Sequence, residues 1–385
     1  MKSLSRAFAP ILAFWLGASA SQAQDVPIVI GADASKRITI CISGFSEEPT
    51  SVLRFDLESV GFLFVPEEKA MFTLVGSQNG QLEGRLYNQA KSMVLGRAYK
   101  DGPLRERTHA LANDIVSAIR QDKGIFLTKI AYRVQHGQQQ SEIVIADFDG
   151  HAAQKVTHDD SLAVSPCWVP GAFALAYTTY QSGFPEILVH NLKTGDRTVV
   201  TAYPGGNYSP AVSPGGRRVA VILSKGGNQD LYVCNIDGSE LRQLTHDVHM
   251  VSSPCWSPKG DKLCFTMLSG LASLYTIPAE GGDPQRLSTV GAQNATEPDW
   301  SPDGTQIAFT SLQGDFHVCV VPAAGGTARL LADGQDPSWA PNSRTIVFTT
   351  GQNQHRRLCL LDVPTKTVKD VQQLSGSCSQ PSWAR

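Results

Sequence analysis

A proline followed two residues later by tryptophan recurs through the last two thirds of the chain and constrains the fold most strongly. The clearest copy is Glu297-Pro298-Asp299-Trp300, and a variant, Ser209-Pro210-Ala211-Val212, has valine in place of tryptophan. Successive motif prolines are 44, 44, 44, 39 and 44 residues apart. Repeats of this length built from short strands are typical of β-propellers, whose blades cover one another's apolar faces. Six motif prolines therefore predict six blades, at Pro166, Pro210, Pro254, Pro298, Pro337 and Pro381.

Each repeat has the pattern of a four-stranded blade. After Trp300, a Pro-Asp-Gly turn at 302–304 precedes β-rich runs at 306–310, 318–321 and 328–331. The sixth copy ends at Arg385, directly after its first strand. Its three missing strands are supplied by runs that precede the first copy, at 128–132, 141–146 and 153–157. We therefore expect the C-terminal strand to close the ring, because an open ring would leave unpaired edges.

The chain begins with the pattern of an export signal. Lys2 and Arg6 precede an apolar run at 7–16, and Ser21-Gln22-Ala23 fits a small-x-small cleavage site. The apolar run is shorter than the roughly 18 residues of a membrane-spanning helix. We predict a signal peptide at 1–23, a mature N-terminus at Gln24, and no direct insertion into a membrane.

Composition limits the kinds of partner and site. The net charge is −2, with no basic excess that would favour nucleic acid. Eight cysteines in an exported chain raise the question of disulfides, and Cys255 and Cys264 flank one tight turn. Others lie within apolar strands, where cysteine behaves as a small hydrophobic residue, so each given bridge is the minority expectation. No CxxC motif or paired histidine spacing supports a metal site, and no cofactor is expected.

Residues 24–124 lack the repeat and read as a small α/β domain preceding the propeller at 125–385. Amphipathic helices are predicted at 50–60, ending at Gly61, and at 104–119. Strands are predicted at 26–30, 38–42, 62–65, 72–75, 82–87 and 93–98. The apolar segment at 24–31 is either the first strand of this domain or a free strand that adds to a partner's sheet, and the residues favour neither.

Motifs for catalysis are absent. The sequence has no Gly-x-Ser-x-Gly elbow, no phosphate-binding GxxxxGK[ST] loop and no HExxH. Asp147-x-Asp149-Gly150 resembles a calcium loop, but no glutamate follows at the required distance, so a hairpin turn is the better interpretation. The histidines are scattered, mostly after strand ends, and we interpret them as surface or loop residues. The motif tryptophans are expected to fill space between blades, with sugar stacking as the minority alternative.

The loops before the blade prolines are predicted to meet at one mouth of the ring and to form the working surface. They are polar, mostly uncharged and rich in hydrogen-bonding groups, which suits protein docking better than acid–base chemistry. They lie at 205–209, 249–253, 294–297 and 335–336.

With these features the chain resembles the TolB family, the periplasmic proteins of the Tol–Pal system of Gram-negative bacteria. The resemblance rests on the domain order, the joining segment at 124–132, and the phrases Ile145-Ala146-Asp147-Phe148-Asp149-Gly150 and Glu297 to Gly304. It implies a monomeric, non-enzymatic periplasmic adaptor that maintains outer-membrane integrity and its constriction during cell division.

The resemblance also implies two partners. The lipoprotein Pal would bind the propeller mouth, at Asn207, Tyr208, Ser209, Val251, Ser252, Thr296 and Glu297. TolA would bind the N-terminal segment, at Asp25, Val26, Pro27, Ile28, Val29, Ile30 and Gly31.

Two regions depart from the family pattern. A histidine of the family's Pal site, four residues before the second blade proline, is Gly206 here, and residues 67–97 follow the pattern poorly. The alternative function is a secreted propeller enzyme or carbohydrate-binding module, such as a lyase. Inward-facing His, Arg or Glu residues in the channel would favour that class.

Overall fold

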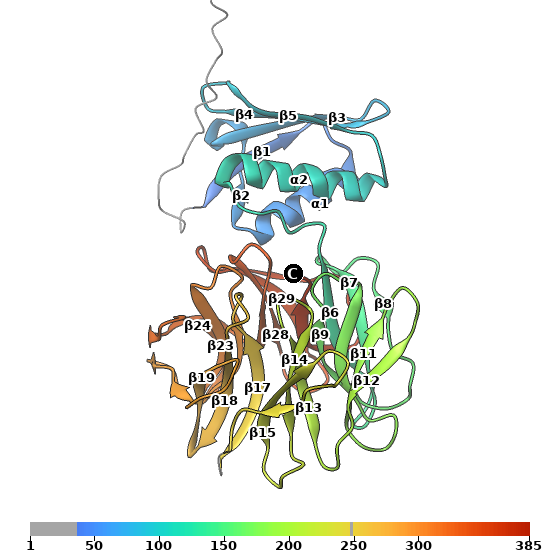
Figure 1. Cartoon of the computed structure of the whole chain (residues 1–385). Helices are drawn as coiled ribbons and strands as arrows, with labels where there is room; N and C mark the ends of the chain where they lie inside the picture. Colours follow the sequence, from blue (N-terminus) through green and yellow to red (C-terminus); the bar gives the residue numbers. More distant parts are fainter. Residues whose placement is uncertain (1–36, 247–248) are drawn as a thin grey trace, which may run out of the picture.

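A computed structural model describes residues 37–246 and 249–385 as a small α/β domain attached to one end of a six-bladed β-propeller (Figure 1). The predicted signal peptide, the strand at 26–30 and the TolA segment at 25–31 lie outside the described residues. Within the described residues, neither α-helix is long and apolar enough to cross a bilayer.

The N-terminal domain is a five-stranded sheet with order β2-β1-β3-β4-β5. Strand β1 pairs in parallel with β2 and β3, and the remaining pairs are antiparallel. All five strands predicted within the described part of this domain are confirmed: β1 (Ile38–Ser43), β2 (Phe62–Phe64), β3 (Phe72–Ser77), β4 (Leu82–Asn88) and β5 (Met93–Tyr99). A 3-10 turn, η1 (Glu67–Lys69), joins β2 to β3.

Two helices cover one face of this sheet and lie between it and the propeller (Figure 1). They are α1 (Glu47–Ser59) and α2 (Leu104–Arg120), which confirms both predicted helices. Helix α2 packs tightly on β4, since a Cβ added at Gly84 would lie 2.6 Å from Cδ1 of Leu111. Gly61 follows α1 with a φ of +81°, as expected at a helix end.

Six four-stranded antiparallel sheets form the propeller, which confirms the predicted blade count. Blade 1 contains β9 (Ala163–Trp168), β10 (Ala174–Thr179), β11 (Glu186–Asn191) and β12 (Arg197–Thr201). Blade 2 contains β13 (Asn207–Val212), β14 (Arg218–Leu223), β15 (Asp230–Asn235) and β16 (Arg242–Gln243). Blade 3 contains β17 (Met250–Trp256), β18 (Lys262–Ser269), β19 (Leu271–Pro278) and β20 (Gln285–Arg286).

The later blades continue this order. Blade 4 contains β22 (Ala295–Trp300), β23 (Gln306–Gln313), β24 (Asp315–Pro322) and β26 (Arg329–Asp333). A separate short parallel pair is formed by β21 (Thr289–Val290), which precedes the blade, and β25 (Gly326–Thr327), which lies between β24 and β26 in the chain. Blade 5 contains β27 (Gln335–Trp339), β28 (Thr345–Thr350), β29 (Arg357–Asp362) and β30 (Thr367–Asp370). Blade 6 contains β31 (Ser377–Trp383), β6 (Lys129–Gln135), β7 (Ser141–Asp147) and β8 (Gln154–Lys155).

Closure of the ring by the C-terminal strand is confirmed. Strand β31 pairs antiparallel with β6, and Trp383 lies opposite Ile130. The motif tryptophans fill space between blades, as expected, and are 7% exposed or less. Two of them also donate a ring N–H to the neighbouring blade, Trp256 to the carbonyl of Ala211 and Trp168 to that of Ser382. Five of the six blades therefore place a buried tryptophan ring against the preceding blade, whereas blade 2 has Val212 at this position; two of the rings also donate a hydrogen bond across the contact.

The structure shows the state of the cysteines and the burial of the histidines. All eight cysteines are free thiols, and Cys255 and Cys264 lie opposite each other on paired strands without a bond between them. The interpretation of the histidines as surface residues is wrong for His109 and His190, which are 3% and 7% exposed. His109 lies in α2 and His190 in β11, and each side chain is on the buried face of its element.

Candidate functional site

A channel runs through the centre of the propeller between the first strands of the six blades. It encloses a cavity of about 520 Å³ that is lined by the repeated Ser/Pro/Trp segments. Its near end is the one beside the N-terminal domain, where the first strands finish and the C-terminus lies (Figure 1). Its far end is the one where the first strands begin, and there the predicted docking loops meet.

The residue before each blade proline has a left-handed backbone, although none of the six is glycine. Their φ angles lie between +49° and +53°, and we call these residues the ring: Ser165, Ser209, Ser253, Glu297, Asp336 and Gln380. At each of them the first strand has a register shift against the second strand. Left-handed backbone is unfavourable for residues with a Cβ and often occurs at functional sites. Six equivalent bulges therefore turn one residue per blade toward the channel.

Hydrogen bonds link part of the ring from blade to blade. The amide N–H of Asp336 donates to Glu297 Oε2 over 3.1 Å. The amide of Gln380 donates to Asp336 Oδ2 over 3.1 Å, and that of Ser165 to Gln380 Oε1 over 3.0 Å. Each acceptor side chain reaches one blade onward, so the strained backbone of the next ring residue is fixed by a neighbouring blade.

Glu297 and Asp336 form an acidic pair within the ring. Burial raises the pKa of Glu297 to about 8, and the charge of Asp336 adds to this effect. Thr310 Oγ1 donates to Glu297 Oε2 over 2.6 Å, which opposes the shift only in part. The pair therefore retains a proton at neutral pH, as expected when two carboxyl groups share a site with low solvent access.

The C-terminal residue, Arg385, lies at the near end of the channel. The Arg385 guanidinium pairs with the Asp299 carboxylate and donates to the carbonyls of Trp300 and Trp339. Asp299 Oδ2 also accepts the amide of Trp339 over 2.7 Å. The acidic charge at this end is thus compensated by a cation from the same chain.

The predicted mouth residues lie together at the far end but differ in accessibility. Tyr208, Ser209, Ser252, Thr296 and Glu297 are partly exposed. Asn207 and Val251 are fully buried. The Asn207 side chain accepts a hydrogen bond from the N–H of Tyr203 and donates one to its C=O, so it fixes the conformation of the loop between them. Val251 packs in the core between blades 2 and 3.

The Tyr208 side chain explains why a glycine is needed at position 206. A Cβ at Gly206 would lie 2.1 Å from Cε2 of Tyr208. The tyrosine ring therefore occupies the space beside Gly206.

Ser165, Gln380, Asp336 and Arg385 were not among the residues predicted to bind Pal, although Asp336 lies in the mouth loop predicted at 335–336. The repeat itself could have identified the first three, because they precede blade prolines just as Ser209 and Glu297 do. Nothing in the local sequence of Arg385 indicates its role, which depends on ring closure.

A family model described as the TolB beta propeller domain matches residues 116–385. The chain belongs to this family. Among curated relatives, it is 32% identical over 168 residues to the Tol-Pal system protein TolB of Desulfosudis oleivorans, which covers 43% of this chain and 38% of that one. It is 32% identical over 241 residues to the Tol-Pal system protein TolB of Dechloromonas aromatica, which covers 54% and 56%. The matched part is less than two thirds of the length of either relative.

A solved structure extends the similarity to the whole architecture. The crystal structure of TolB from Acinetobacter baumannii has a TM-score of 0.82 against this chain, with 22% identity, and covers 91% of this chain and 97% of that one. At this identity the match shows the fold, which is a small α/β domain followed by a six-bladed propeller.

Proposed function

We propose that this protein is a non-enzymatic, monomeric adaptor of the Tol–Pal system in the periplasm. In this proposal it binds a Pal-like lipoprotein at the far end of the channel and TolA through the segment at 25–31, in support of outer-membrane integrity during cell division. The family membership and the Tol–Pal names of the relatives support this assignment.

The observation that carries the docking proposal is the ring. Its bulges place variable, partly exposed side chains around a cavity of about 520 Å³ on a rigid scaffold. Such a surface suits a protein partner that inserts a loop or a side chain into the channel. The Glu297–Asp336 pair would favour a partner that brings hydrogen-bond donors or positive charge.

The channel carboxyl groups are the feature that the alternative, a propeller enzyme, would use. Their oxygens already accept hydrogen bonds within the fold: Glu297 Oε2 from Thr310 and Asp336, and Asp336 Oδ2 from Thr349 and Gln380. These bonds support a structural and docking role for the pair over one in acid–base catalysis.

A reciprocal binding experiment tests both partner assignments. Titration calorimetry would compare the mature chain, a Tyr208→Ala/Thr296→Ala variant, and a chain that lacks residues 25–31. We expect the double variant to lose at least tenfold in affinity for Pal and to retain TolA. The truncated chain should lose TolA and retain a folded propeller. Binding of Pal and TolA that neither change weakens would contradict the proposal.

A further inference from the structure

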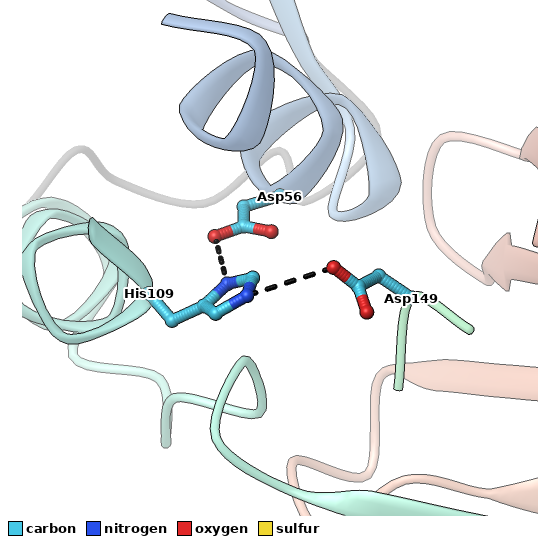
Figure 2. Close-up of side chains that lie close together, drawn as sticks. All are labelled: Asp56, His109 and Asp149. Carbon is cyan, nitrogen blue, oxygen red and sulfur yellow. Dashed lines mark hydrogen bonds and ion pairs between the residues drawn. The ribbon is translucent and has the colours of Figure 1, made fainter. Parts of the chain in front are cut away.

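A buried cluster of three ionisable side chains joins the N-terminal domain to the propeller (Figure 2). Asp56 lies on α1, His109 on α2, and Asp149 in the turn between β7 and β8. Nδ1 of His109 is 2.8 Å from Oδ2 of Asp56, and Nε2 is 3.5 Å from Oδ2 of Asp149. All three residues are 3% exposed or less. One imidazole ring thus lies between a carboxylate of its own domain and a carboxylate of the propeller.

The charges of this cluster balance only when His109 is protonated. Arg105 pairs with Asp149, so two carboxylates face one guanidinium. Neutral imidazole has a single N–H, whereas imidazolium has two. If the single proton is on Nδ1, facing Asp56, the lone pair on Nε2 points at the Asp149 carboxylate. Consistent with this, His109 Nε2 and Asp56 Oδ1 are buried and have no hydrogen-bond partner.

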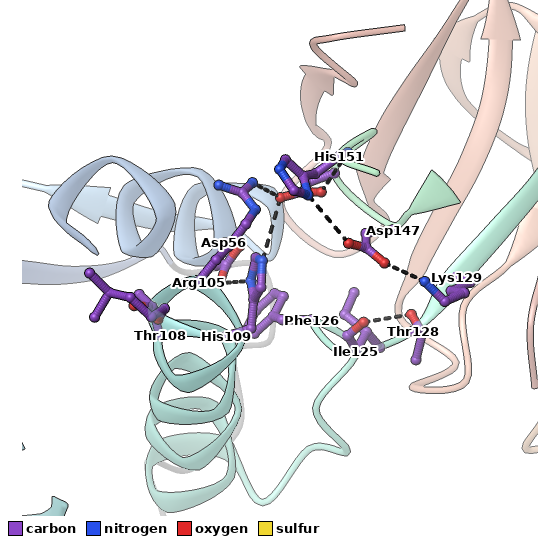
Figure 3. Close-up of polar contacts among 12 residues, drawn as sticks. Asp56, Arg105, Thr108, His109, Ile125, Phe126, Thr128, Lys129, Asp147 and His151 are labelled. Carbon is purple, nitrogen blue, oxygen red and sulfur yellow. Dashed lines mark hydrogen bonds and ion pairs between the residues drawn. The ribbon is translucent and has the colours of Figure 1, made fainter. Parts of the chain in front are cut away.

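The surrounding groups do not supply the missing positive charge. On the propeller side, Lys129 and His151 both pair with Asp147, not with Asp149 (Figure 3). Between α1 and β30, Lys369 pairs with Glu58. The remaining face of the imidazole is apolar. The Phe148 ring packs edge-on against it, with 5.7 Å between the ring centroids, and Phe126 packs against Phe148.

Proton affinity in the cluster is shifted in a consistent direction. Burial lowers the pKa of His109, but the hydrogen bond and charge of Asp56 and the charge of Asp149 outweigh it, so the net shift is upward. Burial also raises the pKa of Asp56 to about 6. Both groups therefore bind protons more tightly in the folded protein than in the unfolded chain.

We propose that His109 is a proton-operated latch between the two domains. As imidazolium it donates to Asp56 and Asp149 and holds the α1–α2 face against the β7–β8 turn. As neutral imidazole it keeps Asp56 and releases Asp149. Because the folded-state pKa lies above the ordinary value of 6.5, this stabilisation is complete below pH 6.5 and is lost as the pH rises through the raised value. The latch does not depend on either proposed binding partner.

A divalent cation is the competing explanation for three buried ligands whose atoms lie within 4.8 Å of one another. The contacts favour the proton, because Arg105 already pairs with the Asp149 oxygen nearest His109. A metal ion at that place would lie against a guanidinium of like charge.

Histidine NMR and hydrogen exchange of the full mature chain test the latch. The resonance that is absent from His109→Gln should titrate with a pKa above 6.5, and Asp149→Asn should lower it by about one unit, which is roughly tenfold in proton affinity. Amide exchange in α1, α2 and residues 147–151, corrected for intrinsic rates, should rise about tenfold between pH 6 and pH 8.5 in the unchanged protein. In His109→Gln it should not depend on pH.

The matched control is His151→Gln, which alters an exposed imidazole on the same turn and should leave both readouts unchanged. A pKa for His109 at or below 6.5, or exchange with equal pH dependence in all variants, would overturn the proposal. Stoichiometric Zn²⁺ binding that His109→Gln abolishes would replace the latch with a metal site. If His109→Gln does not fold, the effect of Asp149→Asn on the His109 pKa decides the matter.

Discussion

The two ends of the propeller differ in how the charges of their acidic side chains are balanced. At the near end, Asp299 pairs with Arg385, Asp149 with Arg105, and Asp362 with Arg344, whose Nε lies 2.6 Å from its Oδ1. At the far end, Glu297 and Asp336 accept hydrogen bonds only from hydroxyl and backbone N–H groups of the described residues, and the pair keeps a proton instead.

Packing differs between the two ends as well. The near end shares one continuous core with the N-terminal domain, in which Phe126 and Phe148 join the α1–α2 face to β29 and β31. A Cβ at Gly61 would lie 2.6 Å from Oδ2 of Asp362, which shows how closely the domains approach. The far end has left-handed backbone and exposed apolar side chains such as Met250, which is 51% exposed. The near end is therefore built for stability, whereas the far end keeps the features expected of a binding surface.

Asp149→Ala should have the largest effect on stability. It leaves Arg105 and His109 without their propeller partner, and breaking a buried ion pair by removal of one member costs about 3 kcal/mol or more. Denaturant unfolding would measure the change. The control is Asp147→Ala on the same turn, whose partners Lys129 and His151 are 40% and 48% exposed, so its loss should be below about 1 kcal/mol. Equal losses of unfolding free energy in the two variants would mean that the ion pairs of Asp149 contribute no more than those of an ordinary surface residue.

Glu297→Gln should have a smaller, pH-dependent effect of opposite sign. The amide can accept the same hydrogen bonds and donate to Asp336, as the protonated carboxyl group does. Because burial raises the pKa of Glu297 from 4.5 to about 8, the unchanged protein loses stability as the pH rises between these values.

The Glu297→Gln variant lacks this loss and should exceed the unchanged protein by about 1–2 kcal/mol at pH 8, with little difference near pH 5. Thermal unfolding across this range, with the exposed Glu240→Gln as a control, measures it. A constant difference between variant and unchanged protein at every pH would show that the far end holds an ordinary, ionised pair.

Sequence reasoning predicted most of the fold because the length and strand pattern of the repeat directly indicate a propeller. The proline–tryptophan spacing fixed the number of blades, and the truncated sixth copy after Pro381 indicated ring closure. The left-handed ring was not predicted, since five of its six positions hold Ser, Glu or Gln, which do not normally mark positive φ.

The buried contact of Asp56, His109 and Asp149 between the two domains was also not predicted. Asp56 and His109 are 53 residues apart and come together only when α1 packs beside α2. A clue was present, because His109 shares a helical face with the apolar Ala112 and Val116. Asp149, by contrast, was correctly interpreted as a turn residue, but its position against another domain follows only from tertiary structure.

Hydroxyl-radical footprinting of the mature chain with purified Pal tests the central claim that the far end of the channel is the docking surface. Oxidation of Tyr208 and Met250 should fall on addition of Pal, while Met93, 61% exposed on the N-terminal domain, should remain equally reactive. Unchanged reactivity of Tyr208 and Met250 under conditions where Pal is bound, or protection of Met93 alone, would contradict the account.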